Sequence, residues 1–201
     1  MSRPDRERLL ALARRRGWLS AQEVARAGIH SQHLTVLVAD GTLERVRRGL
    51  YRIAGSEVTQ HHGLVVASAA VPGAVICLLS ALSFHAIGTQ LPAEVWIAIA
   101  RGRREPKLPY PRLRVVRYSG AAFSEGIEIH ELEARRVKVY SVAKTIADLF
   151  KARHQVGLDV AMEALREAWR ARRFTMAELD RAARACRVER VMRPYVEAIS
   201  A

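Results

Sequence analysis

Residues 20–41 read "SAQEVARAGIHSQHLTVLVADG", a stretch with the signals of two short helices separated by a sharp turn. Ser20 and Glu23 have the spacing of a capping box, in which the two side chains satisfy free N–H groups at the start of a helix. Gly28 ends that helix. Ser31 then caps a second helix, which "DG" at 40–41 closes. The sequence therefore predicts a helix-turn-helix.

A hairpin follows at once in "GTLERVRRGLYRIAG", residues 41–55, where apolar and charged residues alternate as in a strand. Gly49 supplies the backbone freedom that a tight reversal needs, and Arg47 and Arg48 stand beside it at the tip. A further helix is predicted upstream, over residues 3–16. Helix, short helix, turn, helix and hairpin are the order of a winged helix-turn-helix.

Helix geometry divides the residues of the second short helix between two faces. Leu34, Leu37 and Val38 fall together and are expected to face the core. The solvent side carries Gln32 and Val36, with His33 and Thr35 on its flanks. Glutamine can pair with adenine and valine can contact a thymine methyl, so this face suits a DNA major groove. An ordinary exposed helix face is the alternative interpretation.

The hairpin tip is expected to be the wing, whose arginines contact phosphates or the neighbouring minor groove. Charge that only aids solubility is the alternative. Residues 1–54 hold 11 basic and 5 acidic residues, a net charge of +6. The predicted DNA contacts are Ser31, Gln32, His33, Thr35, Val36, Arg45, Arg47, Arg48 and Arg52.

Composition supports a polyanionic partner. The chain of 201 residues carries a formal net charge of +13, and half of its residues are hydrophobic, so a folded nucleic-acid-binding protein is favoured over a membrane-surface protein. The longest apolar run, "AVICLL", is too short to span a bilayer, and the N-terminus lacks a signal peptide. Cys77 and Cys186 form no cluster and are expected to be buried, reduced thiols. These features predict a cytoplasmic protein.

Beyond a polar link at 55–60, residues 61–201 are expected to form a second domain, and each domain is expected to fold alone. Its predicted mixed sheet covers about 74–140 and its helices 141–199. The predicted strands are "AVICLL", "EVWIAIA", "RLRVVRY", "GIEIHEL" and "RVKVYS". Helices are expected in "GLVVASAA" and in "SALSFHAIG", the latter capped by Ser80 and ended by Gly88. The fold class is thus α+β: a winged helix-turn-helix, a mixed α/β domain and a terminal helical subdomain.

No catalytic set emerges from the second domain. The chain has no aspartate between Asp40 and Asp148, so "EPK" at 105–107 lacks the aspartate partner that a metal-dependent nuclease needs. His61 and His62 are adjacent on a helix and make a poor metal pair. Lys144 and Asp148 have the i, i+4 spacing of an ion pair on a helix face, worth a few tenths of a kcal/mol. We predict no enzyme activity, no metal and no cofactor.

Four segments, in this order along the chain, carry a resemblance to a known family: "RGWLSAQEVARAGIHSQHLTVLVADGTLERVRRGLYRI", "VICLLSALSFHAIG", "EVWIAIA" and "VYSVAKTIADLF". Together they resemble the AbiEi-family antitoxins of abortive-infection toxin–antitoxin systems. The resemblance implies an N-terminal domain that binds inverted repeats in its own promoter. It also implies a C-terminal domain that counters a nucleotidyltransferase toxin, with direct contact between the two proteins left open.

Two other functions compete with this interpretation: a winged-helix regulator with a ligand- or partner-sensing second domain and no toxin, and a nuclease fused to a DNA reader. The oligomeric state on DNA is also open. A basic stretch near one helix end is either solvated surface or a second contact site for a nucleic acid or another partner; it comprises Arg166, Arg170, Arg172 and Arg173.

Overall fold

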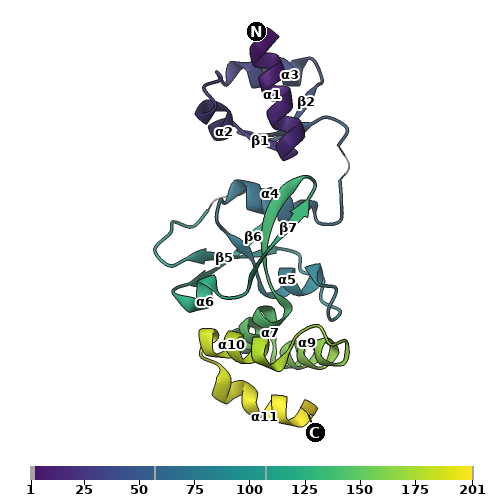
Figure 1. Ribbon diagram of the computed structural model, residues 1–201, viewed down its shortest axis with the longest axis vertical. Helices are drawn as coiled ribbons and strands as arrows, with labels where there is room; N and C mark the ends of the chain where they lie inside the picture. Colours follow the sequence, from purple (N-terminus) through teal and green to yellow (C-terminus); the bar gives the residue numbers. More distant parts are fainter. Residues whose placement is uncertain (1–2, 57, 107, 201) are drawn as a thin grey trace.

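The chain is arranged in three tiers along one long axis, with the N-terminal helices at one end and the last helices at the other (Figure 1). The computed structural model describes residues 3–56, 58–106 and 108–200. No helix within these ranges is long and apolar enough to cross a membrane.

The first tier is the winged helix-turn-helix that the sequence predicts. Its elements are α1 (Arg3–Arg16), β1 (Trp18–Ser20), α2 (Ala21–Arg26), α3 (Gln32–Ala39), β2 (Leu43–Arg47) and β3 (Leu50–Ile53). The strands form an antiparallel sheet in the order β1-β3-β2. Strand β1 is absent from the prediction, because three residues between two helices carry too little alternation to be recognised. The helices bury Leu9, Val24, Leu34 and Leu37 against one face of this sheet.

The second tier is a five-stranded mixed sheet, as predicted. Its order is β6-β5-β4-β8-β7, with β4 parallel to β8, β5 parallel to β6, and the other two pairs antiparallel. The strands are β4 (Val75–Ile76), β5 (Val95–Ala100), β6 (Leu113–Tyr118), β7 (Ile127–Leu132) and β8 (Arg135–Tyr140). The helices of this tier are α4 (His62–Ala70), α5 (Leu78–Phe84) and α6 (Ala121–Ser124).

The predictions for residues 74–88 are partly wrong. Strand β4 stops at Ile76, and α5 begins at Leu78 inside the run that is predicted to be all strand. Ser80 does not cap this helix, because its hydroxyl accepts a hydrogen bond from the Trp96 N–H at 2.9 Å. A short apolar run is equally compatible with a buried strand and a buried helix, so periodicity alone does not divide it.

The third tier consists of helices, as predicted. They are α7 (Val142–Lys151), α8 (Arg153–Val156), α9 (Leu158–Arg170), α10 (Met176–Cys186) and α11 (Glu189–Ser200). A capping box between Thr175 and Glu178 starts α10. The central sheet separates two apolar clusters: Trp96 and Ala98 of β5 face the helices of the third tier, whereas Ile97 and Ile99 face α4.

Lys144 and Asp148 form the predicted i, i+4 ion pair, but the pair lies in the core and not on an exposed helix face. Both side chains are fully buried, and the ammonium donates to both carboxylate oxygens at 2.6 Å. The Cys186 thiol donates to the same carboxylate at 3.1 Å, and the Lys144 ammonium lies 4.0 Å from the centre of the Tyr140 ring. Burial raises the pKa of the Asp148 carboxyl, and the Lys144 ammonium opposes that rise. Every residue from 142 to 150 is buried, so this helix has no solvent face on which an ion pair could lie.

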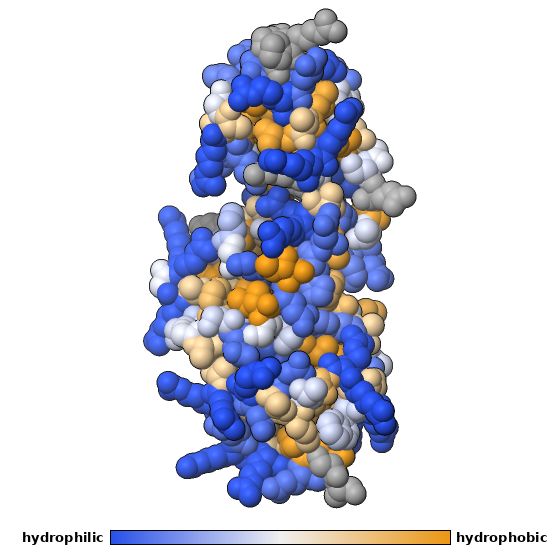
Figure 2. Space-filling model, viewed as in Figure 1, coloured by the Kyte–Doolittle hydropathy of each residue, from blue (hydrophilic) through white to orange (hydrophobic). Residues whose placement is uncertain are grey.

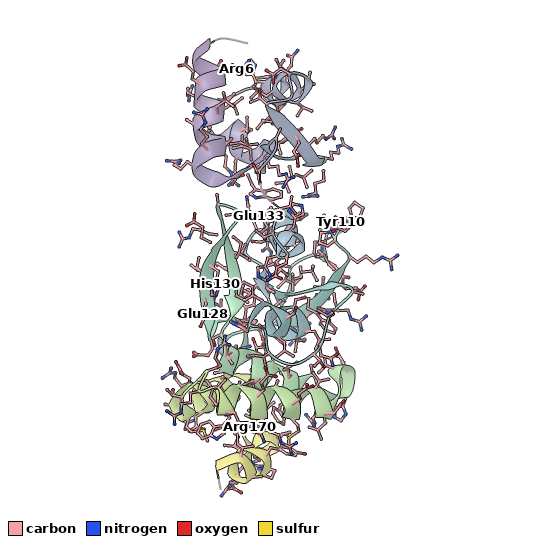
Figure 3. The ribbon with its side chains drawn as sticks, turned by 90° about the vertical axis from the view of Figure 1, so that its right-hand side faces the viewer. Arg6, Tyr110, Glu128, His130, Glu133 and Arg170 are labelled. Atoms are coloured by element: carbon pink, nitrogen blue, oxygen red, sulfur yellow. The ribbon has the colours of Figure 1, made fainter. Side chains whose placement is uncertain are left out.

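The first two tiers meet at the turn between β7 and β8. A Cβ atom on Gly17 would lie 2.4 Å from the Glu133 carbonyl oxygen, so the turn packs directly against the backbone that precedes β1. The Glu133 carboxylate accepts a hydrogen bond from the Thr59 N–H at 3.0 Å and pairs with His62. Trp18 and Leu50 of the first tier belong to the same apolar cluster as α4. Figure 3 shows Glu133 directly below the N-terminal domain.

Candidate nucleic-acid interface

The turn between α2 and α3 sets the position of α3 on the surface. Ser20 and Glu23 form the predicted capping box at the start of α2. Gly28 has a φ of +72°, a left-handed conformation that glycine adopts without steric cost, and it reverses the chain. Ile29 then anchors the turn in the core. The Ser31 side chain makes no cap hydrogen bond; instead, the Gln32 N–H donates to Nδ1 of His30 at 3.2 Å.

The exposed face of α3 is the one that the helical wheel predicts. Leu34 and Leu37 are fully buried, while Gln32, Thr35 and Val36 are exposed. Val36 is 42% exposed, so its methyl groups are accessible on this face. No hydrogen bond of the Gln32 or Thr35 side chain occurs within the described residues. Their polar groups are therefore free to bind a ligand.

His33 lies to the side of this face. Its Nε2 is 3.7 Å from a carboxylate oxygen of Asp5, and its side chain is 20% exposed. The imidazole is thus held against α1, because helical spacing turns it away from Gln32 and Val36. His33 is not part of the exposed face that the other α3 residues form.

The four wing arginines have unequal access to solvent. Arg45 and Arg48 are exposed, and Arg48 forms the tip of the hairpin together with Gly49, whose φ is +77°. Arg47 is half-buried, and its Nε has no hydrogen-bond partner among the residues that the structure describes. Arg52 forms an ion pair with Glu44 on the neighbouring strand, and its side chain is only 11% exposed. The structure therefore presents two of the four predicted wing cations freely.

The cause lies in how the wing sheet is packed. Arg52 pairs with Trp18 across β3 and β1, and Trp18 and Val46 pack into the apolar cluster that contains α4. One face of the sheet covers the core of the first tier, and its other face is turned towards the second tier. Arg52 lies opposite Trp18 in the register, so it has little access to solvent.

A second ion pair lies at the far end of α3. The Thr42 side chain and backbone N–H hold the Asp40 carboxylate and lower its pKa, with a smaller contribution from Arg6, whose guanidinium lies 3.0 Å away. This carboxylate follows the last residue of α3 and is engaged by its neighbours. The exposed face itself contains no acidic side chain.

The candidate catalytic and metal-binding residues of the second tier are engaged in contacts with neighbouring side chains. Glu105 of the "EPK" segment pairs with Arg117 at 2.9 Å. The His61 ring lies against that of Phe84 in a tilted contact, whereas His62 pairs with Glu133, so the two histidines diverge, as predicted. Across the described residues, no group of three or more histidine, cysteine, aspartate or glutamate side chains could hold a metal ion.

Comparisons with known proteins bear on both the interface and the fold. Residues 7–54 match a family model described as "Transcriptional regulator, AbiEi antitoxin". Among solved structures, the chain is similar to the RV2827C protein from Mycobacterium tuberculosis, with a TM-score of 0.55, 15% identity, and coverage of 90% of this chain and 72% of that chain. That likeness concerns the fold alone. No curated protein matches the chain.

The matched residues, 7–54, contain α2, the turn, α3 and the whole wing. The sequence resemblance is therefore confirmed over residues 7–54, the part of the chain that matches the AbiEi antitoxin model.

Proposed function

We propose that this protein is a cytoplasmic autorepressor that binds double-stranded DNA at inverted repeats in its own promoter and also serves as the antitoxin to a nucleotidyltransferase toxin. The observation that carries the DNA-binding proposal is the exposed face of α3, where the side chains of Gln32 and Thr35 make no hydrogen bond to any described residue and Val36 is exposed. The family match over residues 7–54 supports the same role.

In this proposal α3 enters the major groove. The Gln32 amide reads the edge of an adenine, Thr35 bonds to a base or a phosphate, and Val36 contacts a thymine methyl group. Ser31 lies exposed at the start of the helix, where it can bond to a phosphate. Arg45 and Arg48 contact phosphates from the wing, whereas the enclosed Arg52 and the laterally held His33 contribute less.

The antitoxin role is assigned to residues 61–201, with residues 1–54 as the DNA-binding domain and 55–60 as the connector. It is supported by the family match and by the sequence resemblance that extends into the second domain. Neutralisation without a stable toxin–antitoxin complex is compatible with this division. Expression of the chain from an independent promoter should protect cells that carry the neighbouring toxin gene, and a failure to protect would contradict the antitoxin role.

The DNA-binding proposal is tested by Gln32→Ala. If the amide reads a base, the change should weaken binding to a promoter duplex by about 1–3 kcal/mol and binding to a scrambled duplex much less, as measured by fluorescence anisotropy. Gln155→Ala is the control, because Gln155 is also an exposed helical glutamine but lies in the third tier. An equal loss on both duplexes would mean that Gln32 does not read sequence.

A further inference from the structure

A basic cleft lies at the end of the molecule opposite the winged helix. It has a volume of about 800 Å³ and lies where the turn between α9 and α10 meets the last turn of α11. Figure 3 places Arg170 at this end, whereas Arg6 marks the N-terminal domain at the other. The residues that line the cleft are Arg166, Trp169, Arg170, Arg172, Phe174, Thr175, Ala198 and Ile199. The promoter-binding face of α3 is too distant to share a ligand with this cleft.

The charge of this cleft is unbalanced. Arg166, Arg170 and Arg172 are exposed, and none of them forms an ion pair within the described part of the chain, while no acidic residue lines the cleft. The cleft between α10 and α11 differs, because its two arginines share the lining with Asp180, Glu189 and Glu197. Figure 2 shows hydrophilic side chains gathered around this end of the molecule. An anionic ligand fits the first of these clefts.

An aromatic wall stands among the three arginines. Trp169 is half-buried, and its ring lies 5.9 Å from that of Phe174, so the indole is fixed in place while one part of it faces the cleft. The N-terminus of α10 is already capped by the capping box of Thr175 and Glu178, which leaves the arginines as the groups that can bind an anion. A fixed aromatic ring between free guanidinium groups is the arrangement that binds an unstacked base and its flanking phosphates.

Arg172 adds an observation of a different kind. It has a φ of +52°, a left-handed conformation that is costly for any residue with a Cβ atom. Its N–H donates to the Trp169 carbonyl at 3.0 Å, and the Arg173 N–H donates to the Ala168 carbonyl at 2.9 Å. These bonds form a Schellman motif, in which this position is usually glycine. An arginine here places a cation in the cleft at the expense of backbone strain.

We propose that this cleft binds single-stranded nucleic acid, with one base against Trp169 and neighbouring phosphates on Arg166, Arg170 and Arg172. A concave site with a ring in its wall accepts an unpaired nucleotide, whereas the bases of a duplex are stacked and cannot reach the ring. This site is independent of the promoter-binding face, so both can be occupied at once.

The test uses the full chain and a fluorescein-labelled oligouridine of about 12 nucleotides, long enough to span one such site. Arg172→Gly removes the cation and suits the backbone, so it should weaken binding about tenfold while the melting temperature stays unchanged or rises by up to about 4 °C. Arg187→Gly is the matched control: Arg187 ends α10 with a φ of +59° and the same pair of hydrogen bonds, but it does not line the cleft. It should keep full binding.

A second variant measures the binding of phosphates. Arg166→Gln/Arg170→Gln should reduce the slope of log affinity against log salt concentration by about 0.7 for each phosphate that the variant no longer neutralises. A saturating promoter duplex should not displace the oligouridine. Binding of a single-stranded DNA of the matching sequence is measured in parallel, because it shows whether the cleft recognises RNA specifically or any single strand. The proposal is overturned if neither strand binds at low salt, if Arg187→Gly weakens binding as much as Arg172→Gly, or if the duplex displaces the RNA. It is also overturned if Arg172→Gly weakens the binding of an acidic peptide but does not weaken the binding of either nucleic acid.

Discussion

Arg48 and Arg52 lie four positions apart on one hairpin, yet their surroundings separate their roles. Arg48 stands exposed at the tip, whereas Arg52 is enclosed between Glu44 and the second tier. A guanidinium that is already paired and largely removed from water gains little from a phosphate unless its existing interactions break. The exposed cation is therefore the one expected to act on DNA.

The two arginines should consequently respond differently to truncation. Arg48→Ala should weaken binding to promoter and scrambled DNA alike and lower the salt slope by about 0.9, with no change in thermal stability. Arg52→Ala should lower the melting temperature, because it leaves the Glu44 carboxylate without its partner, and should leave the salt slope unchanged. Salt titrations and thermal melts of both variants test this contrast, and identical behaviour of the pair would contradict it.

Lys144 and Asp148 form an ion pair whose contribution to stability depends on both partners being present. Each is fully buried, and each satisfies the other within a cage of aromatic rings. Removing one partner leaves an uncompensated charge in the core, whereas removing both leaves an apolar interior that can pack.

Lys144→Met should therefore cost about 3–5 kcal/mol of unfolding free energy. The double variant Lys144→Met/Asp148→Leu should recover most of that loss, as measured by urea denaturation. Lys138→Met is a suitable control, because Lys138 is an exposed lysine of β8. A double variant less stable than the single variant would show that the pair contributes net stability of its own.

At the scale of elements, sequence patterning is most reliable where periodicity is long. Strands β5 to β8 are each six residues long and are built around Val, Ile or aromatic residues, and the sequence predicts all four. It does not predict the burial of α7, because "VAKTIADLFK" is amphipathic: Lys144, Asp148 and Lys151 fall on one side of the helix, which is typical of a surface helix. Lys144 and Asp148 reinforce that pattern, because their spacing also fits an ion pair on a helix surface.

The sequence likewise predicts only part of the candidate interface. Helical periodicity alone fixes which α3 residues face outward. The partner of Arg52 cannot be read in the same way, because an irregularity in register between Arg45 and Arg47 places Glu44 opposite Arg52. A regular two-residue turn between Arg47 and Leu50 would have placed Glu44 opposite Ile53 instead. Similarly, the position of His33 depends on Asp5, whose proximity depends on how α1 packs.

The buried titratable groups around Asp148 predict how stability depends on pH. Burial raises the pKa of the Cys186 thiol to about 12 and raises the pKa of Tyr118 and Tyr140 above the usual range. In the unfolded chain these groups lose their protons near pH 8.5 and 10. Because the folded-state pKa is higher, their contribution is complete below about pH 8.5 and is lost as the pH rises.

The free energy of unfolding should therefore fall above about pH 9, by about 1.4 kcal/mol per pH unit for each group that has titrated only in the unfolded state. The melting temperature should fall with it. Cys186→Ser keeps a donor for Asp148 but does not titrate in this range, so its stability should fall less steeply between pH 8.5 and 10. Parallel curves for the two proteins would mean that Cys186 does not contribute to the alkaline loss.

On the scale of the whole molecule, the first domain is less independent than the polar link at 55–60 implies. Trp18 and Leu50 are almost fully buried in a cluster that includes α4, and Thr59 within the link bonds to Glu133. A fragment that ends before α4 would expose this apolar surface to water. Independent folding of the N-terminal domain remains a prediction, and the structure indicates that contact with the second tier stabilises it.

Gly17 allows that contact to be tested without cutting the chain. In Gly17→Ala the new Cβ atom would lie 2.4 Å from the Glu133 carbonyl oxygen and 2.8 Å from the Ala134 Cβ, and the backbone φ of +67° is itself unfavourable for alanine. Gly41→Ala carries the same backbone penalty, at a φ of +75°, but its Cβ atom would meet open space. Both variants should lose about 1–2 kcal/mol from the backbone alone.

Only Gly17→Ala should also separate the tiers. We expect its first domain to melt before the remainder, with a red shift of tryptophan fluorescence as Trp18 leaves the apolar cluster, whereas Gly41→Ala should keep a single transition. Promoter binding by Gly17→Ala should persist below that first transition, since the proposed groove contacts lie on α3. If both variants melt in one step with the same emission maximum, then the turn at Glu133 does not hold the winged helix in place. The burial of Trp18 would then depend on α4 alone.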